Sequence, residues 1–234
     1  MLGVITNTVL VIIGSAIGIL LKKGVPEKFS NAIMKAIGLC TIYIGISGAL
    51  VGENTLVIII SMVLGVTLGE LIKLDDNLNK LANKAENRFN KDNNQVGKFS
   101  TGLITATLIF CIGSMTIVGS LNAGLNGDNS LLFTKSILDL FSSFVLASTF
   151  GLGVLFASIS VLVIQGGIVL LADILSPILS TAVVNEMTCV GSIIILALGL
   201  NLINVTKLKI ANFLPAIFMP ILLCPLYNFI SNMF

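Results

Sequence analysis

The sequence lacks histidine and tryptophan altogether and has few charged residues. Charged residues make up 10% of its 234 positions, whereas soluble domains carry about 25%. So few charges cannot cover a surface that faces water, which excludes a soluble globular domain. Nucleic-acid binding and intrinsic disorder are excluded as well, because both need a basic or strongly polar surface.

The missing histidine removes the side chain most used in acid–base catalysis and the commonest ligand of transition metals. The four cysteines lie singly in apolar runs, without CxxC spacing, at Cys40, Cys111, Cys189 and Cys224. We interpret them as small packing residues rather than disulfides or metal ligands. No Walker loop, HExxH or GxSxG motif is present. The sequence therefore predicts no enzyme, no metal site and no cofactor, with a membrane enzyme as the least favoured reading.

What the sequence has in abundance is apolar residues, which form 56% of the chain and give a mean hydropathy of +1.06. This composition predicts an all-α integral membrane protein in contact with the lipid bilayer. A crossing needs about 20 apolar residues, so about eight transmembrane helices fit, at residues 3–21, 30–51, 54–73, 101–121, 131–150, 153–175, 186–205 and 210–231. Seven is the alternative, in which 210–231, with its three prolines, lies at the membrane interface.

The basic residues predict the orientation of these spans. Eleven of the 13 lysines and arginines follow the first, third and seventh spans, at Lys22, Lys23, Lys28, Lys73, Lys80, Lys84, Arg88, Lys91, Lys98, Lys207 and Lys209. Loops rich in lysine and arginine stay in the cytoplasm. We therefore expect an N-terminus outside the cytoplasm and, with eight spans, a C-terminus outside as well.

The longest polar stretch, 74–100, has apolar residues at spacings of four, three, four and four, namely Leu74, Leu78, Leu81, Ala85 and Phe89. This pattern predicts an amphipathic helix on the cytoplasmic leaflet. A simple connector is favoured over a regulatory or partner-docking role.

Two parts of the chain resemble each other. GVITNT at 3–8 resembles GLITAT at 102–107, IGS recurs at 13–15 and 112–114, and FSNAIMK at 29–35 resembles FTKSILD at 133–139. Because three spans are an odd number, such repeats would be inverted in the membrane, as in many secondary transporters. The alternative is chance similarity between apolar helices. The expected divisions are a first three-helix repeat (1–73), the connector (74–100), a second repeat (101–178) and a C-terminal helix pair (179–234).

Glycines interrupt corresponding spans of the two repeats. Paired interruptions of this kind indicate broken helices around a transport site. Close packing of helices through small residues is the alternative, and it also makes a homodimer possible. The candidate hinges are Gly14, Gly18, Gly113, Gly119, Gly166 and Gly167.

Polar residues inside apolar spans are candidates for an ion pathway, because a charge at the centre of a bilayer costs about 3 kcal/mol or more. Lys135 and Asp139 are four residues apart, so they face together and form either a structural ion pair or part of a pathway. Gln165 is the most central polar side chain. Interfacial positions are the alternative for Glu70 and Glu186, as snorkelling is for Lys35. The full candidate set is Asn7, Lys35, Glu70, Ser114, Asp139, Gln165, Glu186 and Asn201.

Several of these stretches together resemble the YdfK/YqgA-like family of bacterial membrane proteins, a domain of unknown function. The resemblance covers nearly the whole chain and rests on Glu186 and on FCIGSM (110–115), GS (119–120), KSILD (135–139), ASTFGLGV (147–154), QG (165–166), GLNL (199–202) and NFLPA (212–216). It implies an inner-membrane protein of seven or eight helices. The chain departs from the family pattern at Gly113-Ser114, where the pattern has Gly-Pro.

The sequence thus favours a secondary transporter or channel for a small ion or polar solute, working between inverted repeats. The alternative is a structural or regulatory membrane protein that acts through a partner protein.

Overall fold

The computed structural model describes residues 1–22, 27–80 and 98–231 of the chain. Every regular element in these ranges is helical. The predicted all-α fold is therefore confirmed.

Four of the described helices are long and apolar enough to cross a membrane: α1 (Leu2–Lys22), α7 (Ser130–Phe150), α8 (Leu152–Leu170) and α10 (Thr181–Leu202). Three bent pairs raise the number to seven if each counts as one span. The pairs are α3 (Thr55–Leu71) with Leu74–Lys80, α5 (Lys98–Cys111) with α6 (Ser114–Leu125), and η2 (Ile210–Phe218) with α11 (Pro220–Ser231). The remaining predicted span, 30–51, corresponds to α2 (Glu27–Ala49), whose apolar part, Met34–Ala49, is shorter than a full crossing.

Local capping explains where two of these helices begin. The side chain of Asn54 accepts a hydrogen bond from the Val57 amide at the start of α3. Ser180 does the same for Val183 at the start of α10. These bonds satisfy amides that have no partner inside the helix.

Before α7, hydrogen bonds from the side chain and then the backbone of Ser130 lower the pKa of the exposed Asp128 carboxyl.

The described chain divides into two compact units. The first consists of Met1–Ile37 and Asp76–Asp173, and the second of Gly38–Asp75 and Ile174–Phe234. This division differs from the boundaries expected at 73, 100 and 178. The first predicted repeat is not a compact body, because α1 packs in the first unit whereas α3 packs in the second. The inverted repeat itself stays a prediction.

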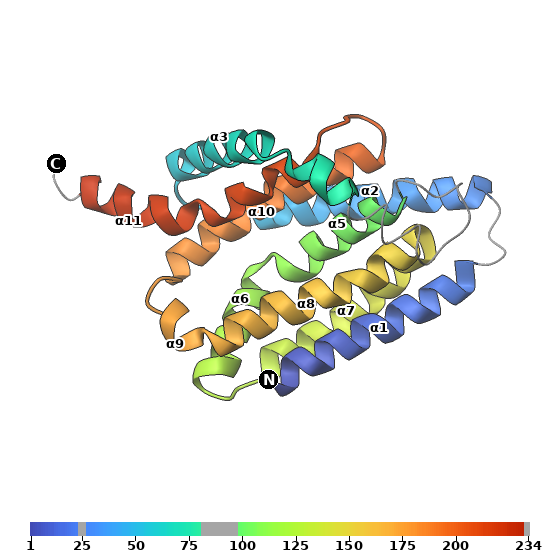
Figure 1. Cartoon of the computed structure of the whole chain (residues 1–234), viewed down its shortest axis with the longest axis horizontal. Coiled ribbons are helices and arrows are strands. Elements are labelled where there is room, and N and C mark those ends of the chain that lie inside the picture. Colours follow the sequence, from blue (N-terminus) through green and yellow to red (C-terminus); the bar gives the residue numbers. More distant parts are fainter. Residues whose placement is uncertain (23–26, 81–97, 232–234) are drawn as a thin grey trace. The chain divides into compact units, whose positions relative to one another are not determined.

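In the first unit, α1 runs alongside α7 and also contacts α8 (Figure 1). The broken pair α5 and α6 packs on α8 and α7. Gly14 and Gly18 of α1 lie against the backbone of Leu140 and Phe144 on α7. A hydrogen atom in place of a side chain allows this close approach. The unit is therefore a bundle whose fourth member is broken in the middle.

In the second unit, α3 packs on η2, and α10 contacts α3, η2 and α11. Small residues again mark the closest approaches. Gly65 and Gly69 of α3 lie against the backbone of Ala216 and Asn212 in η2, and Gly45 of α2 lies against Leu196 of α10.

The predicted amphipathic connector, 74–100, is described only at its two ends. Leu74–Lys80 is helical and bent by 52° from α3, and Lys98 already begins α5. Residues 81–97 lie outside the described part of the chain.

Candidate functional site

An ion pair lies buried within the first unit. Lys135 and Asp139 stand one turn apart on α7, with only 6% and 4% of their surfaces exposed, and the ammonium of Lys135 contacts Oδ2 of Asp139. The predicted pairing of these two residues is confirmed. Their charges cancel, which is what makes their burial in an apolar bundle tolerable.

Two amide side chains from other helices complete what we call the polar cluster: Asn7, Lys135, Asp139 and Gln165. Asn7 of α1 donates from Nδ2 to Oδ2 of Asp139 at 3.0 Å and to Oε1 of Gln165, on α8, at 3.2 Å. Asn7 and Gln165 are both fully buried. Three helices that lie far apart in the sequence therefore meet at this point.

The polar cluster has hydrogen-bonding capacity left over. Oδ1 of Asn7 and Nε2 of Gln165 are buried without a hydrogen-bond partner, one an acceptor and the other a donor. A buried polar group without a partner costs about 1–3 kcal/mol. The hydrogen-bonding groups of the cluster are therefore not all satisfied within the protein.

Apolar residues enclose the polar cluster along the bundle. Val4, Leu132, Val169 and Ala123 form one buried apolar layer, one turn from the cluster. In the opposite direction, Val11 of α1 and Val161 of α8 are fully buried, one turn from Asn7 and Gln165. Ser143 of α7, one turn beyond Asp139, is also fully buried. The charges are thus held among buried residues that are mostly apolar.

A break in the neighbouring span lies close to these charges. The helices α5 and α6 meet at an angle of 59°, and Gly113 between them has φ of 139°. Across the break, the Thr116 hydroxyl donates to the carbonyl of Phe110 at 3.1 Å. Cys111, the last residue of α5, lies within range of the charges of Lys135 and Asp139. The break occurs without a proline, because the backbone conformation of Gly113 is open to glycine alone.

We expect Gly113→Ala to lower the stability of the protein by about 1–3 kcal/mol, since alanine is strained at this φ. The added methyl group itself meets nothing within 4 Å, so the cost comes from the backbone. Thermal unfolding in detergent, followed by the helical circular dichroism signal, measures the change.

Gly167→Ala is the matched control. Gly167 lies inside α8, and a methyl group there also meets nothing within 4 Å. Alanine should stabilise this helix by about 1 kcal/mol. Equal effects of the two substitutions would contradict the assigned strain at Gly113.

The other candidate hinges lie in continuous helices. The expected break at Gly14 and Gly18 is absent, because α1 runs unbroken from Leu2 to Lys22 and uses these glycines to pack on α7. Gly166 and Gly167 lie within α8, and no break occurs there either. Gly119 is inside α6, near Leu131 and Leu132. The small size of Gly14 and Gly18 allows α1 to pack closely on α7.

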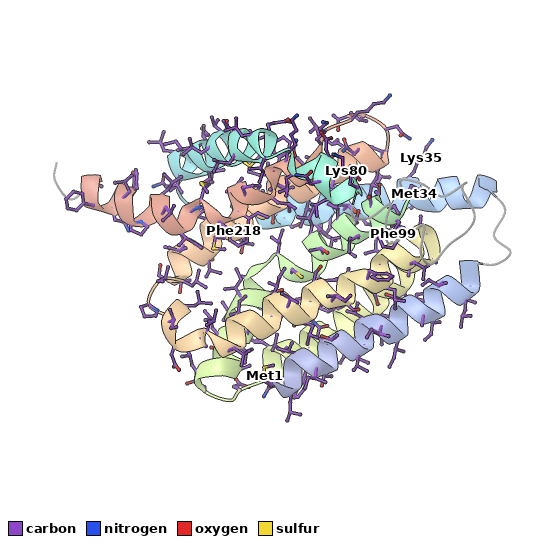
Figure 2. All side chains as sticks on the ribbon, viewed as in Figure 1. Met1, Met34, Lys35, Lys80, Phe99 and Phe218 are labelled. Carbon is purple, nitrogen blue, oxygen red and sulfur yellow. The ribbon has the colours of Figure 1, made fainter. Side chains whose placement is uncertain are left out.

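Several predicted pathway residues do not join the polar cluster. Lys35 is exposed and projects from α2 (Figure 2). Glu70 on α3 and Ser114 at the start of α6 are exposed as well. The structure brings together Asn7, Asp139 and Gln165 from the predicted set. It adds Lys135, which the i, i+4 spacing had paired with Asp139 but which was not in the candidate set.

Glu186 is a second buried carboxylate, within the second unit. Its Oε1 accepts hydrogen bonds from the backbone amides of Glu53 and Asn54, at 2.8 and 2.7 Å, just before α3, while Oε2 has no partner. A carboxylate here satisfies amides at the N-terminal end of a helix and complements its dipole. The contacts give Glu186 a structural task, joining α10 to the start of α3.

Asn201 has a structural task too. Its Oδ1 accepts from the Thr206 hydroxyl and from the Leu208 amide, and its Nδ2 donates to the Leu208 carbonyl. All three bonds hold the loop that follows α10.

If Glu186 mainly supports the start of α3, its shape matters more than its charge. We expect Glu186→Gln to keep both hydrogen bonds and to change stability by less than about 1 kcal/mol. Glu186→Leu leaves the two amides without a partner and should cost about 1–3 kcal/mol. Thermal unfolding of the two variants side by side tests this, and a larger loss for glutamine than for leucine would contradict it.

Comparison with known proteins places the chain in a family. Residues 2–225 match the family described as "Protein of unknown function (DUF554)". The chain belongs to this family. It is 38% identical over 224 residues to the uncharacterized membrane protein YdfK of Bacillus subtilis (strain 168), covering 94% of each chain. It is 28% identical over 218 residues to the uncharacterized protein YqgA of Escherichia coli (strain K12), covering 92% of this chain and 93% of that one. No solved structure matches the chain.

Family membership agrees with the resemblance drawn from the sequence motifs. A relative that is named as a membrane protein, together with several apolar helices of membrane-spanning length, makes this chain a membrane protein.

Proposed function

We propose that this membrane protein is a secondary transporter or channel for a small ion or polar solute, and that the polar cluster lies on the route. The single observation that supports this most strongly is a buried ion pair with two partly unsatisfied amides, contributed by three helices of an apolar bundle.

Energetic cost is the first argument for a functional role. A charge inside a membrane costs about 3 kcal/mol or more, and intramembrane charges are therefore rare outside functional sites. A buried ion pair seldom stabilises a protein more than apolar residues of the same volume would. Lys135 and Asp139 together with the unpaired atoms of Asn7 and Gln165 thus form a costly arrangement for a purely structural role.

The broken helix beside the polar cluster is the second argument. Breaks in membrane helices free backbone groups and occur at the binding sites of many secondary transporters. The break at Gly113 ends α5 at Cys111, near the charges of Lys135 and Asp139. The polar cluster and the helix break thus occur in the same bundle of helices.

The apolar layers favour a secondary transporter over a permanently open channel. The residues of the polar cluster are at least nine-tenths buried, and buried apolar residues lie one turn away in both directions along the bundle. A continuously open pore would expose such residues to water. Opening toward one side at a time is compatible with this enclosure.

The charge pattern supports a location and an orientation. Eleven of the 13 basic residues follow the first, third and seventh predicted spans. By the positive-inside rule this pattern predicts an N-terminus outside the cytoplasm. The resemblance to bacterial membrane proteins supports a location in the inner membrane, and the C-terminus would also lie outside if eight spans cross.

Reconstitution of the purified protein tests the proposed function. Liposomes of phosphatidylethanolamine and phosphatidylglycerol would be assayed for movement of Na⁺, K⁺, Cl⁻, protons and small neutral solutes. We expect flux of at least one of these over protein-free liposomes, and loss of that flux in Asp139→Asn and Gln165→Ala. The exposed Asp128→Asn is the matched control and should retain it. A well-folded protein that moves none of them contradicts the proposal.

A further inference from the structure

The polar cluster also indicates which class of solute it would hold. Resting on the proposed function, we infer that it binds a small uncharged solute that carries a hydrogen-bond donor beside an acceptor, as a carboxamide or a diol does. The solute donates to Oδ1 of Asn7 and accepts from Nε2 of Gln165, next to Gly166.

The carboxylate of Asp139 fixes the orientation of both amides. A carboxylate accepts hydrogen bonds and donates none, so the Asn7 atom 3.0 Å from Oδ2 of Asp139 is the amide nitrogen Nδ2. The same nitrogen donates to Gln165 at 3.2 Å, so the Gln165 atom that accepts is Oε1. The atoms left over are an acceptor on Asn7 and a donor on Gln165, and neither has a partner in the described part of the chain. Asp139 is therefore a positioning residue for this pair.

The two unpaired atoms are close enough together for one small molecule. Each is joined through a single carbon atom to one end of the 3.2 Å hydrogen bond, so the two lie at most about 8 Å apart. Two further hydrogen bonds of about 2.9 Å cover most of such a distance. The neighbouring donor and acceptor of an amide group or a diol provide the rest.

A buried glycine leaves room beside Gln165. Gly166 is buried in α8, yet a methyl group there would meet only the ends of Met1 and Val4 side chains, at 3.9 and 4.0 Å. Two glycines of α1, by contrast, lie directly against the backbone of α7. Val4 is about one turn of α1 from Asn7. The unfilled space thus lies between α8 and α1, beside the polar cluster.

The charges of the cluster favour an uncharged solute over an ion. The ammonium of Lys135 and the carboxylate of Asp139 already neutralise each other. A cation would have to replace Lys135, and an anion would have to replace Asp139. Either exchange leaves one charge buried without its partner, which is strongly unfavourable. A neutral solute leaves the ion pair in place. The other charged side chains of α1, α5, α6 and α8 are Lys22 and Lys98, both at helix ends.

Unpaired hydroxyls elsewhere in the first unit suit the same chemistry. Four are buried and have no hydrogen-bond partner among the described residues, namely those of Ser15 on α1, Ser100 and Thr105 on α5, and Ser120 on α6. A hydroxyl both donates and accepts a hydrogen bond. Groups of this kind replace the bonds that an uncharged solute makes with water, whereas they bring no charge to offset that of an ion.

Swelling of proteoliposomes tests the inference. The vesicles are mixed rapidly with a hyperosmotic solution of acetamide, urea or glycerol, and light scattering follows their shrinkage and then their recovery as solute enters. We expect recovery faster than in protein-free liposomes for at least one of the three. A potential-sensitive dye should show no change, because the solute carries no charge.

Gly166→Ala is the variant that decides the location. Its methyl group fills space beside Gln165 without a close contact, so the unfolding temperature should not fall. The rate of solute entry should fall by about tenfold, as expected for one methyl group in a binding pocket. Gly167→Ala is the matched control. A methyl group at this partly exposed neighbour also meets nothing within 4 Å, and solute should enter at the unchanged rate.

The possible outcomes separate this inference from the proposed function. Flux of Na⁺, K⁺, Cl⁻ or protons without entry of acetamide, urea or glycerol overturns the inference and leaves the proposed transport function standing. Unchanged solute entry in a folded Gly166→Ala protein does the same, since the solute then does not use the space beside Gln165. A folded protein that moves no ion and none of these solutes overturns both. Gel filtration and the helical circular dichroism signal show whether each variant is folded.

Discussion

Lys135→Met should destabilise the protein by about 3–5 kcal/mol, because it leaves the carboxylate of Asp139 buried without its counter-charge. Asp139 is only 4% exposed, and in the described part of the chain its other side-chain hydrogen bond comes from the neutral amide of Asn7. One uncharged amide does not offset the burial of a full charge. Thermal unfolding in detergent, followed by circular dichroism, measures the loss.

The double variant Lys135→Met, Asp139→Asn should regain most of this stability. Removing both charges removes the desolvation cost together with the attraction, and asparagine still accepts the hydrogen bond from Asn7. The exposed Lys35→Met is the control for loss of a lysine and should change stability little. If the double variant were as unstable as Lys135→Met alone, the buried ion pair would not be the cause. The double variant should fold and yet transport nothing, which separates stability from function.

The second large effect concerns the contact between α1 and α7. Gly14→Leu combined with Gly18→Leu should destabilise the protein by at least about 3 kcal/mol, since overfilled contacts force helices apart. Even a Cβ atom at Gly14 would fall on the carbonyl oxygen of Leu140, and one at Gly18 on that of Phe144. Moving α1 away also removes Asn7 from Asp139, so transport should fail together with stability.

Gly167→Leu is the matched control for this pair. It makes the same change in a membrane-spanning helix at a position where a Cβ atom meets nothing within 4 Å. We expect no loss of unfolding temperature there. Unfolding temperatures that fall equally in both proteins would show that leucine is harmful for reasons other than the contact of α1 with α7.

Much of the secondary structure follows from the sequence. Long apolar runs place α1, α7 and α8 within a few residues, because a membrane helix must satisfy its backbone hydrogen bonds internally and present apolar side chains to lipid. The ends of helices were harder to place. The first half of the broken fourth span begins at Lys98 rather than at 101, and α10 begins at Thr181 rather than at 186. The start of α10 is set by the capping side chain of Ser180, and a hydropathy pattern carries no information about caps.

The candidate site was predictable where it depends on local spacing. Lys135 and Asp139 pair because residues four apart lie on one face of a helix. The selection of Asn7 and Gln165 as their partners depends on how α1, α7 and α8 pack together. The sequence did not reveal the roles of Asn201 and Glu186, which were also candidates for a pathway. In the structure Asn201 holds the loop after α10, and Glu186 holds the start of α3.

By itself the sequence determined that this is an all-helical membrane protein, that its basic residues gather after particular spans, and that Lys135 faces Asp139. These are consequences of composition and of short-range geometry. Only the tertiary structure decided that α1 belongs with α7 and α8, that the fourth span breaks at Gly113 whereas the first does not, and that Asn7 and Gln165 complete the polar cluster. The reason is physical. A glycine in a sequence can either break a helix or bring two helices together, and only the neighbour that packs against it selects between the two.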